Sequence, residues 1–161
     1  MTQLETRNLI LTLRSPAEVR AWIDGLDAAV RKELSQGWLQ RIAQARAADP
    51  WLHGFTLIHR ASGVPIGSAG FKAPPDSDGC VEIAYGIDAA HQGRGYATEA
   101  AEALTRFAFE TTEARRVRAH TLPEPNASTR VLTKCGFTRV GEIIDPDDGL
   151  VWRWEKSSAS P

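Results

Sequence analysis

The chain has 161 residues, of which 42% are hydrophobic and 24% are charged, and its 19 Lys and Arg against 20 Asp and Glu give a formal net charge of -1. This is the length and composition of one globular domain that can bury its own core. It excludes a polybasic protein held to nucleic acid by charge, and it excludes long disorder, which needs high net charge and few apolar residues.

The N-terminal part of the chain is expected to form one strand and then helices. Leucines alternate with polar residues within 4–14, which predicts a strand. The segment Ser15-Pro16-Ala17-Glu18 is a capping box with proline at the first helical position, so a helix begins there. Asp27 is expected to cap a second helix that extends to Ile42, with Gly37 as the position at which it could break.

The hydrophobic period then changes to that of strands. Two segments, 53–60 and 64–71, flank the turn residues Ala-Ser-Gly and form a predicted hairpin. A third strand is expected over 80–87. After a turn, a longer helix begins near residue 96, because alanine, leucine and phenylalanine recur there at intervals of three and four.

The C-terminal part contains a strand, a short helix and a second hairpin. A strand over 116–121 precedes a helix that Asn126 can cap and that Gly136 can end, because glycine accepts a positive φ without steric cost. Strands over 138–144 and 150–156 follow around a turn rich in Asp and Pro. The order of all these elements predicts a mixed α/β pattern on one sheet.

Cysteine content and apolar runs indicate a cytoplasmic protein. Cys80 and Cys135 have no CxxC spacing, which favours free thiols over a disulfide scaffold or a zinc site. The opening MTQLETRNLI lacks the regions of a signal peptide, and no apolar run approaches the roughly 18 residues of a membrane helix. We therefore expect no membrane partner.

The most informative stretch is QGRGYA, residues 92–97, between a predicted strand and a predicted helix. Two glycines at a helix start let the backbone approach a ligand, and the free N–H groups with the helix dipole make an anion site suited to a pyrophosphate. The stretch lacks the lysine of a phosphate-binding P-loop. The dinucleotide fingerprint also fails, because Thr98 stands where that motif needs glycine or alanine.

A third interpretation fits these residues. The run Gln92-Gly93-Arg94-Gly95-Tyr96-Ala97 resembles the Gln/Arg-x-x-Gly-x-Gly/Ala signature of the GNAT superfamily of acyl-CoA-dependent N-acyltransferases. Asn126-Ala127-Ser128 and the later Gly136-Phe137 are similar to that family's Asn-x-Ser helix and closing Gly-Phe. The opening LETRNLILTL resembles the branch that includes ribosomal-protein alanine N-acetyltransferases.

The resemblance covers nearly the whole chain, roughly residues 4–156, and implies one N-acetyltransferase domain over 1–161 with a frayed tail at 157–161. The implied architecture is the GNAT fold, an α/β (α+β) arrangement in which helices flank a mixed, mostly antiparallel sheet with splayed central strands. Dimers are common in this family, so a homodimer is compatible with the sequence.

The resemblance also implies acetyl-CoA as co-substrate, without a metal. The pantetheine arm would bond to main chain near Tyr85 and Ile87, the pyrophosphate would lie on N–H groups of 93–98, and Asn126 would reach toward the pantetheine or the thioester. The cofactor-binding residues expected on this basis are Tyr85, Ile87, Gln92, Gly93, Arg94, Gly95, Tyr96, Ala97, Thr98 and Asn126.

Glu82, Ser128 and Asn126 are the expected catalytic residues. An ammonium must lose a proton before it attacks, and Glu82, where related enzymes often carry a carboxylate, could accept it; a solvated strand residue is the alternative. Many family members have a tyrosine four residues before the closing glycine, but Leu132 stands there. Ser128 is the expected substitute that protonates the leaving thiolate, and a plain helix N-terminal hydrogen bond is its alternative.

The implied reaction moves an acetyl group from acetyl-CoA to a primary amine, a small molecule or a protein N-terminus, by direct attack. A non-catalytic acyl-CoA-binding or sensor module and a nucleotide-binding oxidoreductase are the alternatives. Trp22, Trp38 and Trp51 lie in the region that walls the acceptor pocket in this family, yet the helical spacing of Trp22 and Trp38 favours core packing. No metal or nucleic acid is expected, because the four histidines share no ligand spacing and the net charge is near zero.

Overall fold

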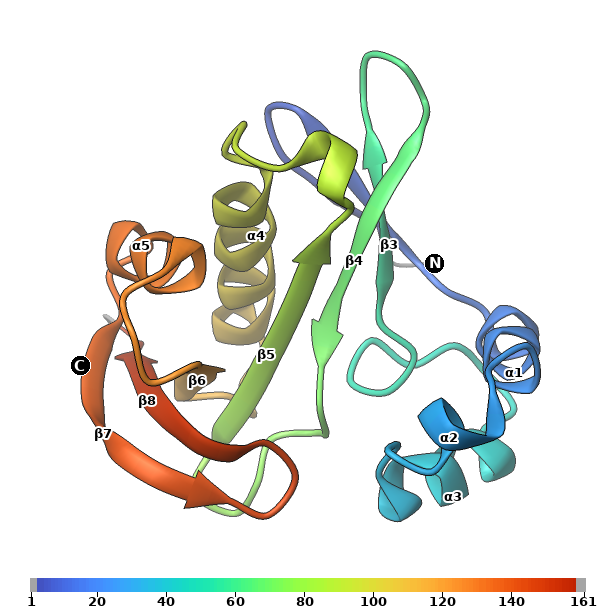
Figure 1. Cartoon of the computed structure of the whole chain (residues 1–161). Coiled ribbons are helices and arrows are strands. Elements are labelled where there is room, and N and C mark those ends of the chain that lie inside the picture. Colours follow the sequence, from blue (N-terminus) through green and yellow to red (C-terminus); the bar gives the residue numbers. More distant parts are fainter. Residues whose placement is uncertain (1–2, 159–161) are drawn as a thin grey trace.

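The computed structural model describes residues 3–158, which form one eight-stranded sheet with helices on its faces (Figure 1). The strands are ordered β1-β2-β3-β4-β5-β6-β8-β7, and all neighbours are antiparallel except β5 and β6. The elements are β1 (Gln3–Glu5), β2 (Leu9–Leu13), α1 (Pro16–Asp24), α2 (Ala28–Arg31), α3 (Gln36–Gln44), β3 (Phe55–His59), β4 (Pro65–Phe71), β5 (Cys80–Ile87), a 3-10 turn (Ala89–His91), α4 (Tyr96–Glu110), β6 (Arg116–Thr121), α5 (Ala127–Lys134), β7 (Thr138–Asp145) and β8 (Gly149–Ser157).

Local sequence signals are confirmed at most element ends. The Ser15 capping box begins α1, and Asn126 caps α5 by accepting the N–H of Thr129 at 2.9 Å. Gly136 ends α5 with φ 85°, a conformation that a side chain would strain. Strands β5 and β6 have the bounds that alternation predicts.

Three predictions about element bounds are wrong. The strand predicted within 4–14 is interrupted between β1 and β2, which pair as a hairpin. The second helix is divided into α2 and α3 near Leu34 rather than at Gly37, because Ser35 caps a new helix by accepting the N–H of Trp38. The tail is ordered through Ser158, whose N–H donates to Arg115 O at 2.9 Å, whereas 159–161 lie outside the described residues.

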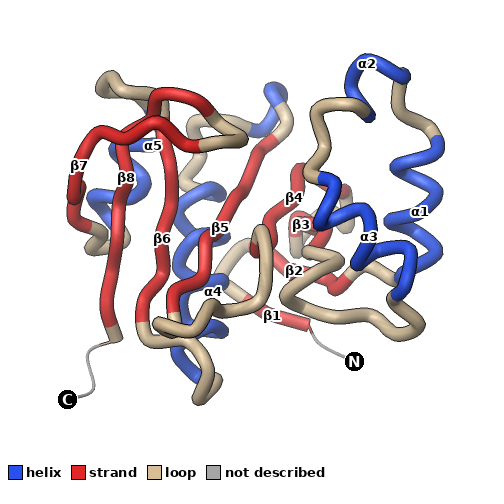
Figure 2. Tube along the Cα trace, turned by 90° about the horizontal axis from the view of Figure 1, so that it is seen from below, coloured by secondary structure: helices blue, strands red, loops and turns tan. Residues whose placement is uncertain are grey.

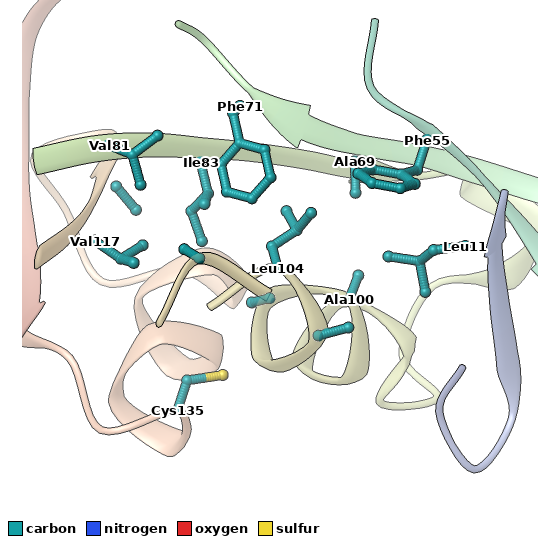
Figure 3. Close-up of a cluster of buried hydrophobic side chains, with 14 of the residues drawn as sticks. Leu11, Phe55, Ala69, Phe71, Val81, Ile83, Ala100, Leu104, Val117 and Cys135 are labelled. Atoms are coloured by element: carbon teal, nitrogen blue, oxygen red, sulfur yellow. The ribbon is translucent and has the colours of Figure 1, made fainter. Parts of the chain in front are cut away.

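The main core lies between the sheet and α4, as Figure 3 shows with Leu104 between the helix and the sheet. Leu104 and Ala100 are fully buried, and alanines on the same face let the helix approach β5 closely. This stripe is the one that the recurrence of alanine and leucine predicts. None of the described helices combines the length and the apolar character that crossing a membrane demands.

The sheet opens at its middle, where the parallel strands β5 and β6 are paired at one end only. Cys80, Val81 and Glu82 are in register with 116–118, while the rest of β5 leans away (Figure 2). The predicted splay of the central strands is therefore confirmed. Helices α1 and α3 form a small separate core around Val19 and Ile42, on the flank of the sheet beyond β4 (Figure 1).

Candidate active site

The open edge of β5 presents main-chain groups to the splay. Glu82 O accepts from Lys72 N at 3.0 Å, and Asp88 N donates to Ile66 O at 2.8 Å, so the even-numbered residues of this stretch bond toward β4. Because backbone direction alternates along a strand, the N–H and C=O groups of the odd-numbered residues 83, 85 and 87 point to the opposite side, into the splay.

The glycine turn after β5 forms a cradle of amides. Gly93 and Gly95 have φ of 78° and 84°, and a Cβ on either would meet no atom within 4 Å. Gly95 is the N-cap of α4 and supplies no side-chain cap, so the amides of the first helical turn, at 96–98, lack the usual intrahelical partners. This arrangement has the space and the donors that a diphosphate needs.

Gln92 joins the glycine turn to the open strand. Its Nε2 donates to Ile87 O at 2.9 Å, so one of the predicted residues fixes the end of β5 relative to the turn. Arg94 lies exposed between the two glycines, where its charge is available to an anion on the cradle.

Tyr85 and Ser128 meet across the splay. Their hydroxyl oxygens are 3.2 Å apart, which links β5 to the first turn of α5. Burial raises the pKa of Tyr85 more than the hydrogen bond with Ser128 lowers it, so its hydroxyl keeps its proton at neutral pH. Asn126 uses Oδ1 in the α5 cap. Leu132 is fully buried on α5.

Glu82 lies on the face of β5 opposite to Tyr85, in a cluster of charged side chains. Its Oε2 is 2.9 Å from Lys72 Nζ and 3.4 Å from His120 Nδ1. Lys72 Nζ also contacts Asp148 Oδ2 at 2.7 Å, and His120 Nδ1 lies 3.3 Å from that oxygen. Arg153 Nε donates to His120 Nε2 at 3.1 Å, which assigns the ring proton to Nδ1 and makes His120 a donor toward Asp148.

Lys72 and Asp148 stabilise each other's charged form. Burial lowers the pKa of Lys72, but its hydrogen bonds and charge interactions with Asp148 and Glu82 outweigh burial and raise it. Burial raises the pKa of Asp148, and the hydrogen bond and charge of Lys72 outweigh that effect and lower it. Lys72 and Asp148 are therefore both charged near neutral pH.

The ligand atoms of Glu82, His120 and Asp148 all lie within 4.8 Å of one another, a spacing that could suit a metal ion. The Lys72 ammonium already contacts both carboxylates. A cation in this place would therefore have to displace it, since like charges at this distance repel.

A groove of about 960 Å³ lies on the sheet face that carries this cluster. Small residues of β4 and β5 make its floor, including Ser68, Gly70, Ala84 and Gly86. The α1–α3 region contributes Trp22 and Trp38, and the β7–β8 turn contributes Asp147 and Asp148. Strands far apart in sequence thus enclose an opening large enough for a sizeable acceptor.

Three tryptophans predicted near the acceptor pocket divide between the wall of the groove and the hydrophobic cores. Trp22 is 48% exposed and lines the groove, so the expectation of core packing is wrong there, because α1 buries Val19 instead. Trp38 does both, since it packs on the small core and donates Nε1–H to Leu52 O at 2.9 Å. Trp51 packs edge-on against Phe71 in the main core.

Sequence reasoning missed three members of the charged cluster: Lys72, His120 and Asp148. Lys72 could have been found, because a hairpin of 64–71 and 80–87 places it opposite Glu82. Asp148 could not, because it comes from a turn 76 residues beyond Lys72. The predicted thiols are free and buried, and burial raises the pKa of Cys135 to about 11, which fits an unreactive thiol.

Comparisons with known proteins agree with this geometry. Residues 2–138 match the profile of a protein family described as acetyltransferase (GNAT) domain. Uncharacterized N-acetyltransferase p20 of Bacillus licheniformis is 30% identical over 91 residues, a match that covers 56% of this chain and 51% of that protein. The chain thus spans about half the length of the curated relatives that it matches first.

Solved structures share the fold over almost the full chain. The ribosomal-protein-S5-alanine acetyltransferase of Vibrio fischeri has a TM-score of 0.71 at 17% identity, covering 99% of this chain and 98% of that one. An acetyltransferase (GNAT family) from Bacillus anthracis has a TM-score of 0.68 at 17% identity, covering 97% and 98%.

Proposed function

Because the chain belongs to the GNAT acetyltransferase family, we propose that it transfers an acetyl group from acetyl-CoA to a primary amine. The observation that carries the proposal is the junction of β5 and α4, where an open strand edge runs into two glycines of positive φ and an uncapped helix start. An extended arm that ends in a diphosphate suits such a junction, because the strand edge pairs with the arm and the amides bind the phosphates.

The binding residues follow from that junction. The pyrophosphate lies on the amides of 93–98 with Arg94 beside it, and the pantetheine arm pairs with main chain at Tyr85 and Ile87 as an added strand. Asn126, on the far side of the splay, directs its Nδ2 donor toward the arm, because Oδ1 is occupied by the helix cap.

Glu82 is the proposed general base. The amine arrives as an ammonium with a free pKa of about 10.4, so it must lose a proton before it can attack. The carboxylate accepts this proton directly or through one water, and Lys72 Nζ lies 2.9 Å from its Oε2. His120 and Lys72 act as positioning residues, since both hold Glu82 in place.

The transfer step balances with the groups at hand. The amine nitrogen attacks the thioester carbonyl carbon, a C–N bond forms, and the C–S bond breaks. Main-chain N–H near Ile87 donates to the carbonyl oxygen as negative charge develops there. The leaving thiolate takes a proton from Ser128, whose hydroxyl lies 3.2 Å from that of Tyr85. The attacking nitrogen loses its second proton as the amide forms, and that proton, passed through water, restores the Ser128–Tyr85 pair.

The acceptor is a small-molecule amine or a protein N-terminus, since a groove of about 960 Å³ has room for either. A thiol-release assay with acetyl-CoA and a panel of amines, amino acids and N-terminal peptides tests the function. We expect release of free CoA that depends on both substrates and matches the acetylated product. Tight CoA binding without turnover on any amine would instead indicate the sensor module.

A further inference from the structure

Arg14 is a partly buried cation that lines the acceptor groove, and its Nε has no hydrogen-bond partner among the described residues. It follows β2 directly, its N–H donates to Gly54 O at 3.0 Å, and its side chain lines the groove. The guanidinium Nε is buried and has no hydrogen-bond partner among residues 3–158. The ion pairs found within this part of the chain do not include it.

The fold makes room for this guanidinium at the groove floor. Gly54 has φ 72°, and a Cβ there would lie 3.4 Å from Arg14 Nη2 and 3.3 Å from Ala69 O. A side chain at this position would therefore press on both the guanidinium and the next strand, and its backbone conformation would be strained.

The acidic residue that acts on Arg14 bonds to the backbone instead. Glu18 attracts Arg14 electrostatically, but its Oε1 accepts the Ser15 N–H at 3.1 Å in the capping box. Burial lowers the pKa of Arg14 more than Glu18 raises it. Keeping the guanidinium charged at this place therefore reduces the stability of the fold. A buried charge is normally paired, because an unpaired one loses its hydration without compensation.

A second donor beside Arg14 is also free. His53 precedes Gly54 and lines the same groove, and its Nδ1 accepts the Asp49 N–H at 3.0 Å. The ring proton therefore lies on Nε2, which is buried and has no partner within the described part of the chain. Burial lowers the pKa of His53, which keeps the ring neutral and the donor in place.

Building on the proposed acetyl transfer, we infer that the acceptor carries a carboxylate that binds Arg14 while its amine lies at Glu82. The planar fork of arginine binds a carboxylate through two parallel hydrogen bonds. Asp147 and Asp148 of the β7–β8 turn line the same groove, and Lys72 is paired with Asp148. The groove thus carries Arg14 beside β2 and a cluster with two aspartates at the β7–β8 turn.

Spacing selects the length of the acceptor. Arg14 follows β2 and Glu82 lies on β5, three strand intervals away at ~4.8 Å each and two residues farther along the strands at ~3.4 Å each, so about 16 Å separates the two backbones. Both side chains shorten this gap, which leaves about two to three extended residues at ~3.5 Å each. A free α-amino acid is too short, whereas a peptide with an acidic residue at position 2, 3 or 4 fits.

The test compares peptides with a free N-terminus and an amidated C-terminus that carry Glu or Gln at position 2, 3 or 4. For the unaltered protein we expect KM about tenfold lower with Glu at one of these positions, since a charged hydrogen-bonded pair contributes about 1.5 kcal/mol. Arg14→Gln should bring the ratio of the Glu and Gln peptides close to one. Arg14→Lys should keep part of the preference, and the exposed Arg46→Gln should keep all of it.

Transfer with equal KM for Glu and Gln peptides at every position would overturn the inference and leave the proposed function standing. A preference that survives in Arg14→Gln would also overturn it. If no amine is acetylated, the proposed function fails and this inference fails with it. Calorimetry of the Glu and Gln peptides with the CoA-loaded protein measures the same preference from binding alone. Thermal melts show whether each variant is folded.

Discussion

Lys72 illustrates how one residue can set the charge state of a site. Its ammonium lies 2.7 Å from Asp148 and 2.9 Å from Glu82, and it keeps two nearby carboxylates from repelling each other. The pKa of Lys72 is raised and that of Asp148 is lowered, so this contribution to stability is lost in two windows. It falls as pH rises through the raised lysine value, and as pH falls through the lowered aspartate value.

At the residue scale, Glu82→Gln should lower kcat by about 10²–10⁴-fold, because the amide cannot accept the proton of the amine. The dissociation constant of CoA should stay the same, since the glycine turn and the edge of β5 are untouched. Steady-state kinetics and calorimetry measure the two effects. The exposed Glu110→Gln is the matched control, and wild-type rates of Glu82→Gln at every pH would remove Glu82 from the mechanism.

The N-terminus of α4 serves two purposes at the element scale. Its first amides face the open glycine turn, while Glu99 in the same turn bonds to the β1–β2 connection. Glu99 accepts from Thr6 Oγ1 at 2.5 Å, from Asn8 N at 2.9 Å and from Asn8 Nδ2 at 2.7 Å. Glu99 is thereby bound to the β1–β2 connection, and its carboxylate does not occupy the amides of the glycine turn.

Gly95→Glu should abolish CoA binding while the fold persists, because a carboxylate would fill the cradle and repel the phosphates. Gly63→Glu is the matched control. Gly63 also has a positive φ, 72°, and open space for a Cβ, but it lies in the β3–β4 turn. Both variants should lose similar stability in thermal melts, and only Gly95→Glu should lose affinity in calorimetry. Equal affinities would contradict the phosphate site.

Glu99→Gln should destabilise the fold by about 1–2 kcal/mol at pH 7, because hydrogen bonds to a carboxylate become hydrogen bonds to a neutral amide. Burial raises the pKa of Glu99, but the bonds from Asn8 and Thr6 outweigh it and lower the pKa. The carboxylate therefore stabilises the fold above its unfolded pKa, and that contribution fades as pH falls through the lowered value. Denaturant unfolding at pH 7 and near pH 3 should show the gap between the two proteins shrink in acid.

The whole molecule is arranged around an opening rather than a continuous sheet. Helix α4 packs on the sheet along β5, next to the point where β5 and β6 part, and its buried side chains form the main core (Figures 1 and 3). The groove lies on the other face, between the α1–α3 region and the β7–β8 turn. Core packing on one face thus leaves the opposite face free for the acceptor.

Leu104→Ala should lower the free energy of unfolding by about 2–5 kcal/mol, because Leu104 is fully buried between α4 and the sheet and the cavity cannot fully collapse. Ile144→Ala is the control, since Ile144 is 81% exposed and its loss should change stability by less than about 0.5 kcal/mol. Urea unfolding of both variants measures the difference. Equal destabilisation would mean that the core does not centre on α4.

Much of the fold follows from local rules, and the site follows in part. Alternation predicts the bounds of β5 and β6, and the Ser15 and Asn126 caps begin the helices where expected. The Ser35 cap was missed, because helical spacing continues across it and hides the break. Asp148 joins Lys72 through a contact 76 residues apart, which no local pattern reports.

The sequence by itself determined the chain's class, its glycine turn and the placement of Glu82 on the strand beside that turn, because each depends on residues close together in the chain. Only the tertiary structure decided that Lys72, His120 and Asp148 surround Glu82, and that Arg14 lines the same groove with an Nε that no other described residue pairs. The physical reason is that strand order and splay determine which distant side chains meet. Exclusion of solvent and contact between charges then determine their protonation states.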